Sequence, residues 1–241
     1  MAVIFDLDDT LMDYSGAVYE CWRIICDRFA PELCDRLPDD ITGAIKIQSK
    51  WYWADAHRHR EGRLDMNRAR MDIIGAVFQQ FGIENADLIR EMAFAYDKER
   101  EKMYRLYPET IDVLKNLISM NIALAMITNG DAGIQRKKID RFGLEPYFQI
   151  ILIESEFGAG KPDERVYRHV AEMLNLRPSD IWMVGDNLDW DVLGPQKIGI
   201  AGIWHNRSGA ELPEPVPARP AYIIKDLSEI LGLIRGDITP V

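Results

Sequence analysis

The stretch Val3-Ile4-Phe5-Asp6-Leu7-Asp8-Asp9-Thr10-Leu11 decides how the rest of the chain can be interpreted. Three apolar residues followed by acids at i and i+2 are typical of a buried parallel strand that ends in a turn. Ligands of α/β sheets gather beyond the carboxyl ends of the strands, so Asp6 and Asp8 lie where chemistry is expected. Neighbouring carboxylates repel each other, and a metal ion is the simplest partner that would hold them together. Taken alone, Asp6-Leu7-Asp8 could also be an acidic loop segment beside a helix that Thr10 caps.

Composition restricts the class of protein. The chain has 241 residues, of which 47% are hydrophobic and 28% charged, which suits one α/β core with a modest insertion. A net charge of −10 repels nucleic acid and anionic membranes, so neither is expected as a partner. No apolar stretch approaches the ~20 residues of a membrane span, and the amino terminus lacks a basic region followed by an apolar run, so we expect a cytoplasmic protein. The three cysteines have no C-x-x-C spacing, which favours buried thiols over a disulfide framework or a zinc site.

Hydrophobic periodicity divides the chain into two regions. Residues 14–104 show apolar positions at helical spacing and no strand pattern, which predicts a helical bundle. The remainder alternates strand and helix patterns, which predicts a parallel sheet covered on both faces. The predicted strands lie at 2–5, 122–127, 149–153, 181–184, 199–203 and 221–224. Before the second of them, a helix is predicted with Pro108 in its first turn and with one apolar face formed by Ile111, Leu114, Leu117 and Ile118. We therefore expect an α/β core domain at 1–13 and 105–241, interrupted by a helical domain at 14–104.

Two of the later predicted strands are followed by groups that suit an anion. Ile127-Thr128-Asn129-Gly130 offers a hydroxyl and open backbone N–H groups, although Asn-Gly also favours an ordinary turn. Gly158-Ala159-Gly160-Lys161-Pro162 presents an ammonium from a defined backbone, whereas most lysines are solvated surface residues. Such cations are needed locally, because the overall negative charge repels phosphate.

A second acidic cluster follows another predicted strand. The segment from Gly185 to Asp191 carries acids at Asp186, Asp189 and Asp191, which is typical of ligands for a hard cation such as Mg²⁺. Helix capping is the alternative. A second acidic cluster at the end of a strand favours the metal site.

These four segments, in this order and each at a predicted strand end, resemble the haloacid dehalogenase (HAD) superfamily of phosphohydrolases. Asp6-x-Asp8-x-Thr10 matches its first motif, Thr128 the second, Lys161 the third, and Gly185-Asp186 with Asp191 the fourth. The resemblance covers the whole chain, and the insertion after the first motif is similar to the C1-type helical cap. It implies a Rossmann-like parallel-sheet core with an inserted α-helical cap domain.

The resemblance also implies a mechanism. Asp6 would be the nucleophile that attacks phosphorus to give an aspartyl-phosphate, and Asp8 would protonate the leaving alkoxide and later activate water. Mg²⁺ would be held by Asp6, Asp186 and the backbone carbonyl of Asp8.

The other matched residues would hold the phosphate. Thr128 and Lys161 would bind its non-bridging oxygens with help from the backbone of Asn129. Asp191 would orient Lys161 or the waters on the metal, although Asp189 is close enough in sequence to compete for that role.

The function these residues imply is that of a Mg²⁺-dependent phosphomonoester hydrolase acting on a small phosphorylated metabolite. A phosphomutase shares the same core residues and remains an alternative. A 2-haloacid dehalogenase is disfavoured because that branch lacks an acid at the position of Asp8. A non-catalytic binding relative is disfavoured because no motif acid is missing.

One stretch of the predicted cap, Trp51 to Arg63, is dense in aromatic and basic residues. Aromatic residues at helical spacing are usually core, which would leave His57, Arg58, His59 and Arg60 on a solvated face. The alternative is that some of these side chains lie over the mouth of the site and bind the substrate.

Overall fold

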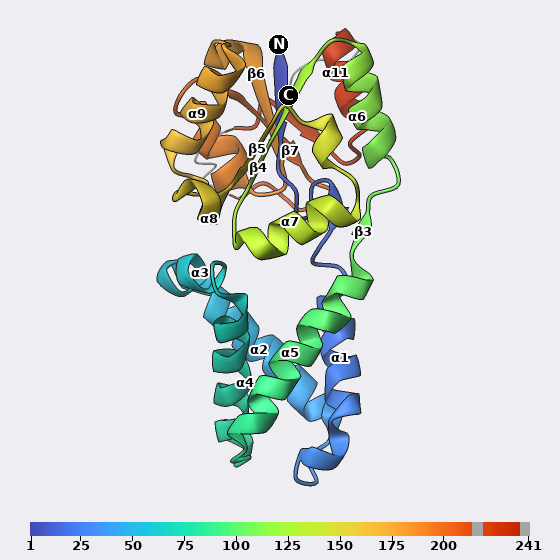
Figure 1. Cartoon of the computed structure of the whole chain (residues 1–241), viewed down its shortest axis with the longest axis vertical. Helices are drawn as coiled ribbons and strands as arrows, with labels where there is room; N and C mark the ends of the chain where they lie inside the picture. Colours follow the sequence, from blue (N-terminus) through green and yellow to red (C-terminus); the bar gives the residue numbers. More distant parts are fainter. Residues whose placement is uncertain (214–218, 237–241) are drawn as a thin grey trace. The chain divides into compact units, whose positions relative to one another are not determined.

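The structure is a computed structural model that describes residues 1–213 and 219–236. The chain forms two compact units (Figure 1). One consists of Met1–Asp13 and Arg105–Val241, and the other of Tyr14–Tyr104.

The first unit is built on a parallel sheet whose strand order is β5-β4-β1-β6-β7-β8. The amino-terminal strand is thereby central, with Phe5 opposite Met126 on one side and Val184 on the other. This arrangement confirms the predicted fold class. The strands are β1 Ala2–Phe5, β4 Ala123–Thr128, β5 Ile150–Ile153, β6 Ile181–Gly185, β7 Ala201–His205 and β8 Tyr222–Ile224.

Helices cover both faces of this sheet, with α8 and α9 on one side and α6 and α11 on the other (Figure 1). All four residues of β1 are buried, and Ala2 and Ile4 pack in one cluster with Val166 and Val170 of α9. Burial on both faces explains why this strand is apolar without alternation. The helices are α6 Thr110–Ser119, α7 Ala132–Arg141, α8 Glu154–Phe157, α9 Glu164–Leu174, α10 Gly194–Gln196 and α11 Glu229–Arg235, with 3-10 turns at Glu145–Tyr147 and Pro178–Asp180 and a π-helical turn at Leu188–Leu193.

Helices are the only regular structure among the described residues of the second unit. Its core includes Trp22 and Tyr96, whose ring centroids lie 4.0 Å apart, and most of the apolar residues at helical spacing. The helices are α1 Val18–Arg28, α2 Pro38–Ala54, α3 Ala56–Gly62, α4 Met66–Phe81 and α5 Ala86–Met103, with a 3-10 turn at Ala30–Glu32.

Several local predictions differ from the structure. Of the three cysteines expected to be buried thiols, Cys21 and Cys26 are buried but Cys34 is exposed. We expected a helix with Pro108 in its first turn and Ile118 on its apolar face, but α6 begins at Thr110 and Ile118 is 44% exposed. The buried face of α6 includes Val113, because Val113 and Leu117 are separated by about one turn. The two-residue strands β2 (Met12–Asp13) and β3 (Arg105–Leu106) pair antiparallel and were not predicted, since so short a pairing has no periodic pattern.

Among the helices of residues 1–213 and 219–236, none combines the length and apolar character that crossing a membrane requires.

Candidate active site

The ammonium of Lys161 lies between two buried carboxylates at the carboxyl edge of the sheet. Its Nζ is 2.6 Å from Oδ1 of Asp6, at the end of β1, and 2.6 Å from Oδ1 of Asp191, which follows β6. The side chain of Lys161 is 1% exposed and that of Asp191 is fully buried. Lys161 and Asp191, which lie 155 and 185 positions after Asp6, meet it because the carboxyl ends of the parallel strands β5, β1 and β6 lie at the same edge of the sheet.

The turn after β1 connects the two acidic segments. Thr10 donates its hydroxyl to Oδ2 of Asp6 at 3.3 Å and accepts the backbone N–H of Asp186 at 3.1 Å. Thr10 is completely buried. It therefore orients the carboxylate of Asp6 and the loop of Asp186 together, rather than capping a helix.

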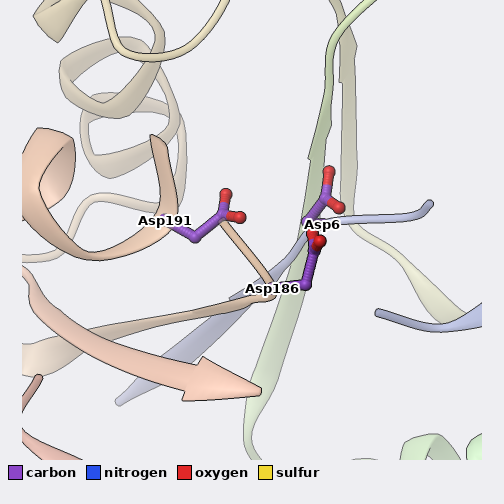
Figure 2. A group of neighbouring side chains, drawn as sticks. All are labelled: Asp6, Asp186 and Asp191. Carbon is purple, nitrogen blue, oxygen red and sulfur yellow. The ribbon is translucent and has the colours of Figure 1, made fainter. Parts of the chain in front are cut away.

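Three carboxyl groups converge at this point. The carboxyl groups of Asp6 and Asp186 lie side by side, and that of Asp191 points toward them (Figure 2). One oxygen from each lies within 4.8 Å of the other two. A side chain at Gly185 would meet Asp191, because a Cβ there would lie 2.2 Å from its Cγ. Only glycine allows this approach.

The electrostatics of the cluster are unfavourable without a further cation. Burial raises the pKa of Asp6 to about 7, with Asp191 adding to the effect and Lys161 opposing it. Burial also raises the pKa of Asp186 to about 8, with further contributions from Asp6 and Asp191. Burial alone would lower the pKa of Lys161, but Asp191 and Asp6 outweigh it and hold that pKa above its ordinary value.

The donor set fits a divalent hard cation. When all three carboxyl groups are ionised, they and the ammonium of Lys161 leave two negative charges in a cluster of which Asp6 and Asp191 are buried, and the ligand atoms that the cluster offers are carboxylate oxygens. Mg²⁺ prefers oxygen ligands. Both oxygens of Asp191 have partners, because its Oδ1 contacts Lys161 and its Oδ2 accepts the backbone N–H of Asn187 at 3.0 Å. The two oxygens of Asp6 likewise contact Lys161 and Thr10.

The loops that carry Asn129 and Lys161 are held together by side chains. The amide of Asn129 donates to the carbonyl of Lys161 at 2.8 Å, and its oxygen accepts the N–H of Lys161 at 2.7 Å. Glu154, the first residue after β5, accepts the N–H of Gly130 at 2.8 Å. The Asn129 side chain thus fixes the backbone that presents Lys161.

Thr128 and Asp8 belong to a second network. The side-chain amide of Gln135 donates to Thr128 Oγ1 at 2.5 Å and to Asp8 Oδ2 at 3.1 Å. Lys138 Nζ lies 2.8 and 2.7 Å from the two carboxylate oxygens of Asp8 and 2.7 Å from Oε1 of Gln135. The carboxylate of Asp8 therefore faces α7, whereas that of Asp6 faces Lys161.

Sequence reasoning missed Glu154, Gln135 and Lys138. Polar residues of a helix are normally assigned to its solvated face, which is how Gln135 and Lys138 escaped notice. Their spacing of three residues, which places them on one face of the helix after Thr128, was the available signal. Glu154 had the same signal as the other site residues, since it directly follows a predicted strand.

The structure separates the two acids that competed for the role beside Lys161. Asp191 contacts the ammonium, whereas Asp189 is exposed and its backbone N–H donates to the side chain of Asn187.

The Trp51–Arg63 stretch has both buried and exposed members. Tyr52 is buried, whereas Trp51 is 56% exposed. The guanidinium of Arg58 lies 3.7 Å from the centroid of the Trp51 ring and donates to the carbonyls of Trp51 and Tyr52 at the end of α2. Arg60 is exposed. Arg58 thus has a structural partner within its own unit, and Arg60 is the more accessible cation.

The chain is similar to known proteins over most of its length. The family model described as haloacid dehalogenase-like hydrolase matches residues 1–199. Phosphoserine phosphatase of Thermus thermophilus is 38% identical over 141 residues, which cover 58% of this chain and 55% of that protein. N-acylneuraminate-9-phosphatase of Mus musculus is 26% identical over 253 residues, which cover 98% of this chain and 94% of that protein.

A solved structure shows the same fold. The HAD hydrolase YfnB of Bacillus subtilis, in a crystal form bound to magnesium, has a TM-score of 0.76 to this chain. The two share 23% sequence identity, and the superposition covers 97% of each chain.

Proposed function

Because the chain belongs to the haloacid dehalogenase-like hydrolases, we propose that it is a magnesium-dependent phosphomonoester hydrolase that works through an aspartyl-phosphate on Asp6. The observation that carries the proposal is the group of three carboxyl groups, two of them buried, beside the buried ammonium of Lys161. When all three carboxyl groups are ionised, a divalent cation would bring this group to neutrality. The phosphatases among its relatives, and the magnesium in YfnB, support the same activity.

Asp6, Asp186 and the backbone carbonyl of Asp8 would hold the Mg²⁺ ion, which would screen the repulsion between carboxylate and phosphate and stabilise charge on the non-bridging oxygens. The chain itself supplies Lys161 as a fixed cation beside Asp6. It also presents the hydroxyl of Thr128 and the backbone around Asn129, at the end of β4, to the phosphate.

In the first step a carboxylate oxygen of Asp6 attacks phosphorus, and the bond from phosphorus to the leaving oxygen breaks. Asp8, which enters this step in its protonated form, gives its proton to that oxygen, so the product leaves as an alcohol. In the second step Asp8 takes a proton from water as the water oxygen attacks phosphorus. The bond from phosphorus to Asp6 then breaks, which releases inorganic phosphate and restores both carboxyl groups.

The substrate would be a small phosphorylated metabolite, and its alcohol part would be the leaving group. The two phosphatases compared above are named for an amino-acid phosphate and a sugar-acid phosphate, so their leaving groups differ widely. A panel of phosphorylated metabolites that includes both classes is the direct way to find the substrate.

The test is phosphate release from an aryl phosphate by metal-stripped protein, with and without added Mg²⁺. We expect turnover only with Mg²⁺, and a phosphorylated Asp6 in acid-quenched protein by mass spectrometry. Asp6→Asn should lower turnover by roughly 10⁴-fold or more, since the nucleophile is gone. It should remain folded, because it removes one buried charge. Substantial activity in Asp6→Asn, or full activity of the stripped wild type in EDTA, would overturn the proposal.

A further inference from the structure

Gln135 and Lys138 on α7 are buried polar residues to which the proposed mechanism gives no role. Each is 2% exposed, although one is an amide and the other an ammonium. Burying a lysine is costly unless its charge is paired and its protons are bonded. Here the ammonium meets both oxygens of Asp8 and the amide oxygen of Gln135, at 2.7 to 2.8 Å.

The orientation of the Gln135 amide follows from its partners. A lysine ammonium can only donate, so the group of Gln135 that faces Lys138 must be its oxygen. The nitrogen of Gln135 then donates one proton to Asp8 and the other to Thr128. The amide oxygen and both amide protons of Gln135 therefore each have a partner, and one orientation of the amide satisfies all three.

This arrangement has a consequence for Thr128. Its hydroxyl oxygen accepts a proton from Gln135, so its own proton is directed away from Gln135. That proton is therefore free to be donated to an anion at the end of β4. One amide thus sets the direction of a donor for phosphate and the position of a carboxylate that would transfer protons.

We propose that Lys138 and Gln135 are positioning residues that hold Asp8 for proton transfer to the leaving oxygen and aim the Thr128 hydroxyl at the phosphate. The inference rests on the proposed function, because it assigns a purpose to the two contacts that Asp8 and Thr128 make. Lys138 holds the carboxylate by both oxygens, which restricts its rotation. Gln135 donates to both Asp8 and Thr128, so it fixes the position of the proposed acid relative to the proposed phosphate-binding hydroxyl.

The two positions should have separable kinetic effects. Lys138→Met should lower kcat for an alkyl phosphate by ~10- to 100-fold, because a misplaced acid no longer protonates a poor leaving group. An activated aryl phosphate departs without that proton, so its kcat should change much less. Gln135→Met should in addition raise KM and the inhibition constant for inorganic phosphate several-fold, because the Thr128 hydroxyl loses its orientation.

The closing experiment measures kcat/KM over a series of alkyl and aryl phosphates for wild type, Lys138→Met, Asp8→Asn and the double variant. We expect a steeper dependence on leaving-group acidity in Lys138→Met, and little further loss when Lys138→Met is added to Asp8→Asn. Lys138→Arg should recover part of the alkyl activity. Lys137→Met, at the adjacent exposed position of α7, is the matched control and should behave as wild type.

Three results would overturn parts of this scheme in distinguishable ways. No turnover by the wild type in Mg²⁺ defeats the proposed function itself. Turnover by the wild type with equal losses on alkyl and aryl substrates in Lys138→Met, or with fully additive losses in the double variant, defeats only the positioning role. If Lys138→Met does not fold, Gln135→Met carries the test, and an unchanged inhibition constant for phosphate together with an unchanged leaving-group dependence overturns the inference.

Discussion

Two buried lysines serve the two sides of this site, and their charge environments differ. Lys161 lies between Asp6 and Asp191 with Asp186 nearby, so its surroundings carry more negative charge than it can neutralise. Lys138 is matched by Asp8, whose side chain is 25% exposed. The first group therefore needs either protons or a cation from solution to balance its charge, whereas Lys138 and Asp8 balance each other. Metal dependence is thus expected to belong to the Asp6 side and proton transfer to the Asp8 side.

Replacing Asp8 should have the largest kinetic effect on the second group. Asp8→Asn should lower kcat for an alkyl phosphate by on the order of 10²–10⁴, since it removes the acid and base. The loss on an aryl phosphate should be clearly smaller. Parallel assays on the two substrate types measure this, and equal losses would indicate that Asp8 acts structurally.

Replacing Lys161 should lower the unfolding free energy more than replacing Lys138. In metal-free protein at pH 8, Lys161→Met should cost about 3–5 kcal/mol of unfolding free energy, because Asp6 and Asp191 lose their counterion in a buried place. Lys138→Met should cost about 1–3 kcal/mol, because Asp8 keeps partial contact with water. Urea unfolding in EDTA gives both values, with the exposed Lys137→Met as the reference. A larger cost for Lys138→Met would reverse the comparison.

Some features of the fold and the site could be predicted from the sequence, and others could not. The six strands of the parallel sheet were predictable because each is an apolar run, and the HAD-like fold and hydrolase family are confirmed. The assignments of Asp6, Asp8, Lys161 and Asp186 came from their places at strand ends, and their roles stay predictions. Gln135 and Lys138 were not found, because a polar residue on a helix has the same pattern whether it faces solvent or a buried carboxylate.

The limits at element boundaries have a similar cause. Ile118 was placed on the apolar face of α6 by its residue type, yet it is 44% exposed, since the residues around it decide which stripe is buried. Asp191 and Asp189 were indistinguishable by spacing alone. The π-helical turn at Leu188–Leu193 separates them, because it leaves Asp191 buried beside Lys161 and Asp189 exposed.

The unfolding free energy of the metal-free protein should depend on pH, because the carboxyl groups of Asp6 and Asp186 lack a cation that would balance their charge. The pKa values of Asp6 and Asp186 are raised to about 7 and about 8, so the metal-free folded state retains protons that the unfolded state has already lost. Its unfolding free energy should therefore fall as pH rises from the ordinary carboxyl range near ~4 toward those values. Mg²⁺ takes the place of the protons, so it should raise Tm by several degrees more at pH 8 than at pH 5.5.

Thermal unfolding in EDTA and in Mg²⁺ at the two pH values measures this difference. Asp186→Asn removes one of the raised carboxyl groups and should flatten both the pH dependence and the Mg²⁺ response. Asp189→Asn, at the exposed acid of the same loop, should leave both unchanged. A Mg²⁺ response that is equal at the two pH values would show that the cation does not replace protons at this cluster.

The smallest expected effect concerns the basic stretch of the helical unit. Arg58 is engaged by the Trp51 ring and by two carbonyls, so its replacement would combine any loss of binding with a loss of structure. Arg60 is exposed and is the better probe. If the stretch binds the leaving group, Arg60→Gln should raise KM for the metabolite found in the substrate panel a few-fold, by charge and stacking contacts of the kind that guanidinium groups make. KM for a minimal aryl phosphate should stay constant, because that substrate offers no group to contact. Equal KM ratios in wild type and Arg60→Gln would instead identify Trp51–Arg63 as packing and solvated surface, and would leave substrate selection to the residues around Asp8 and Thr128.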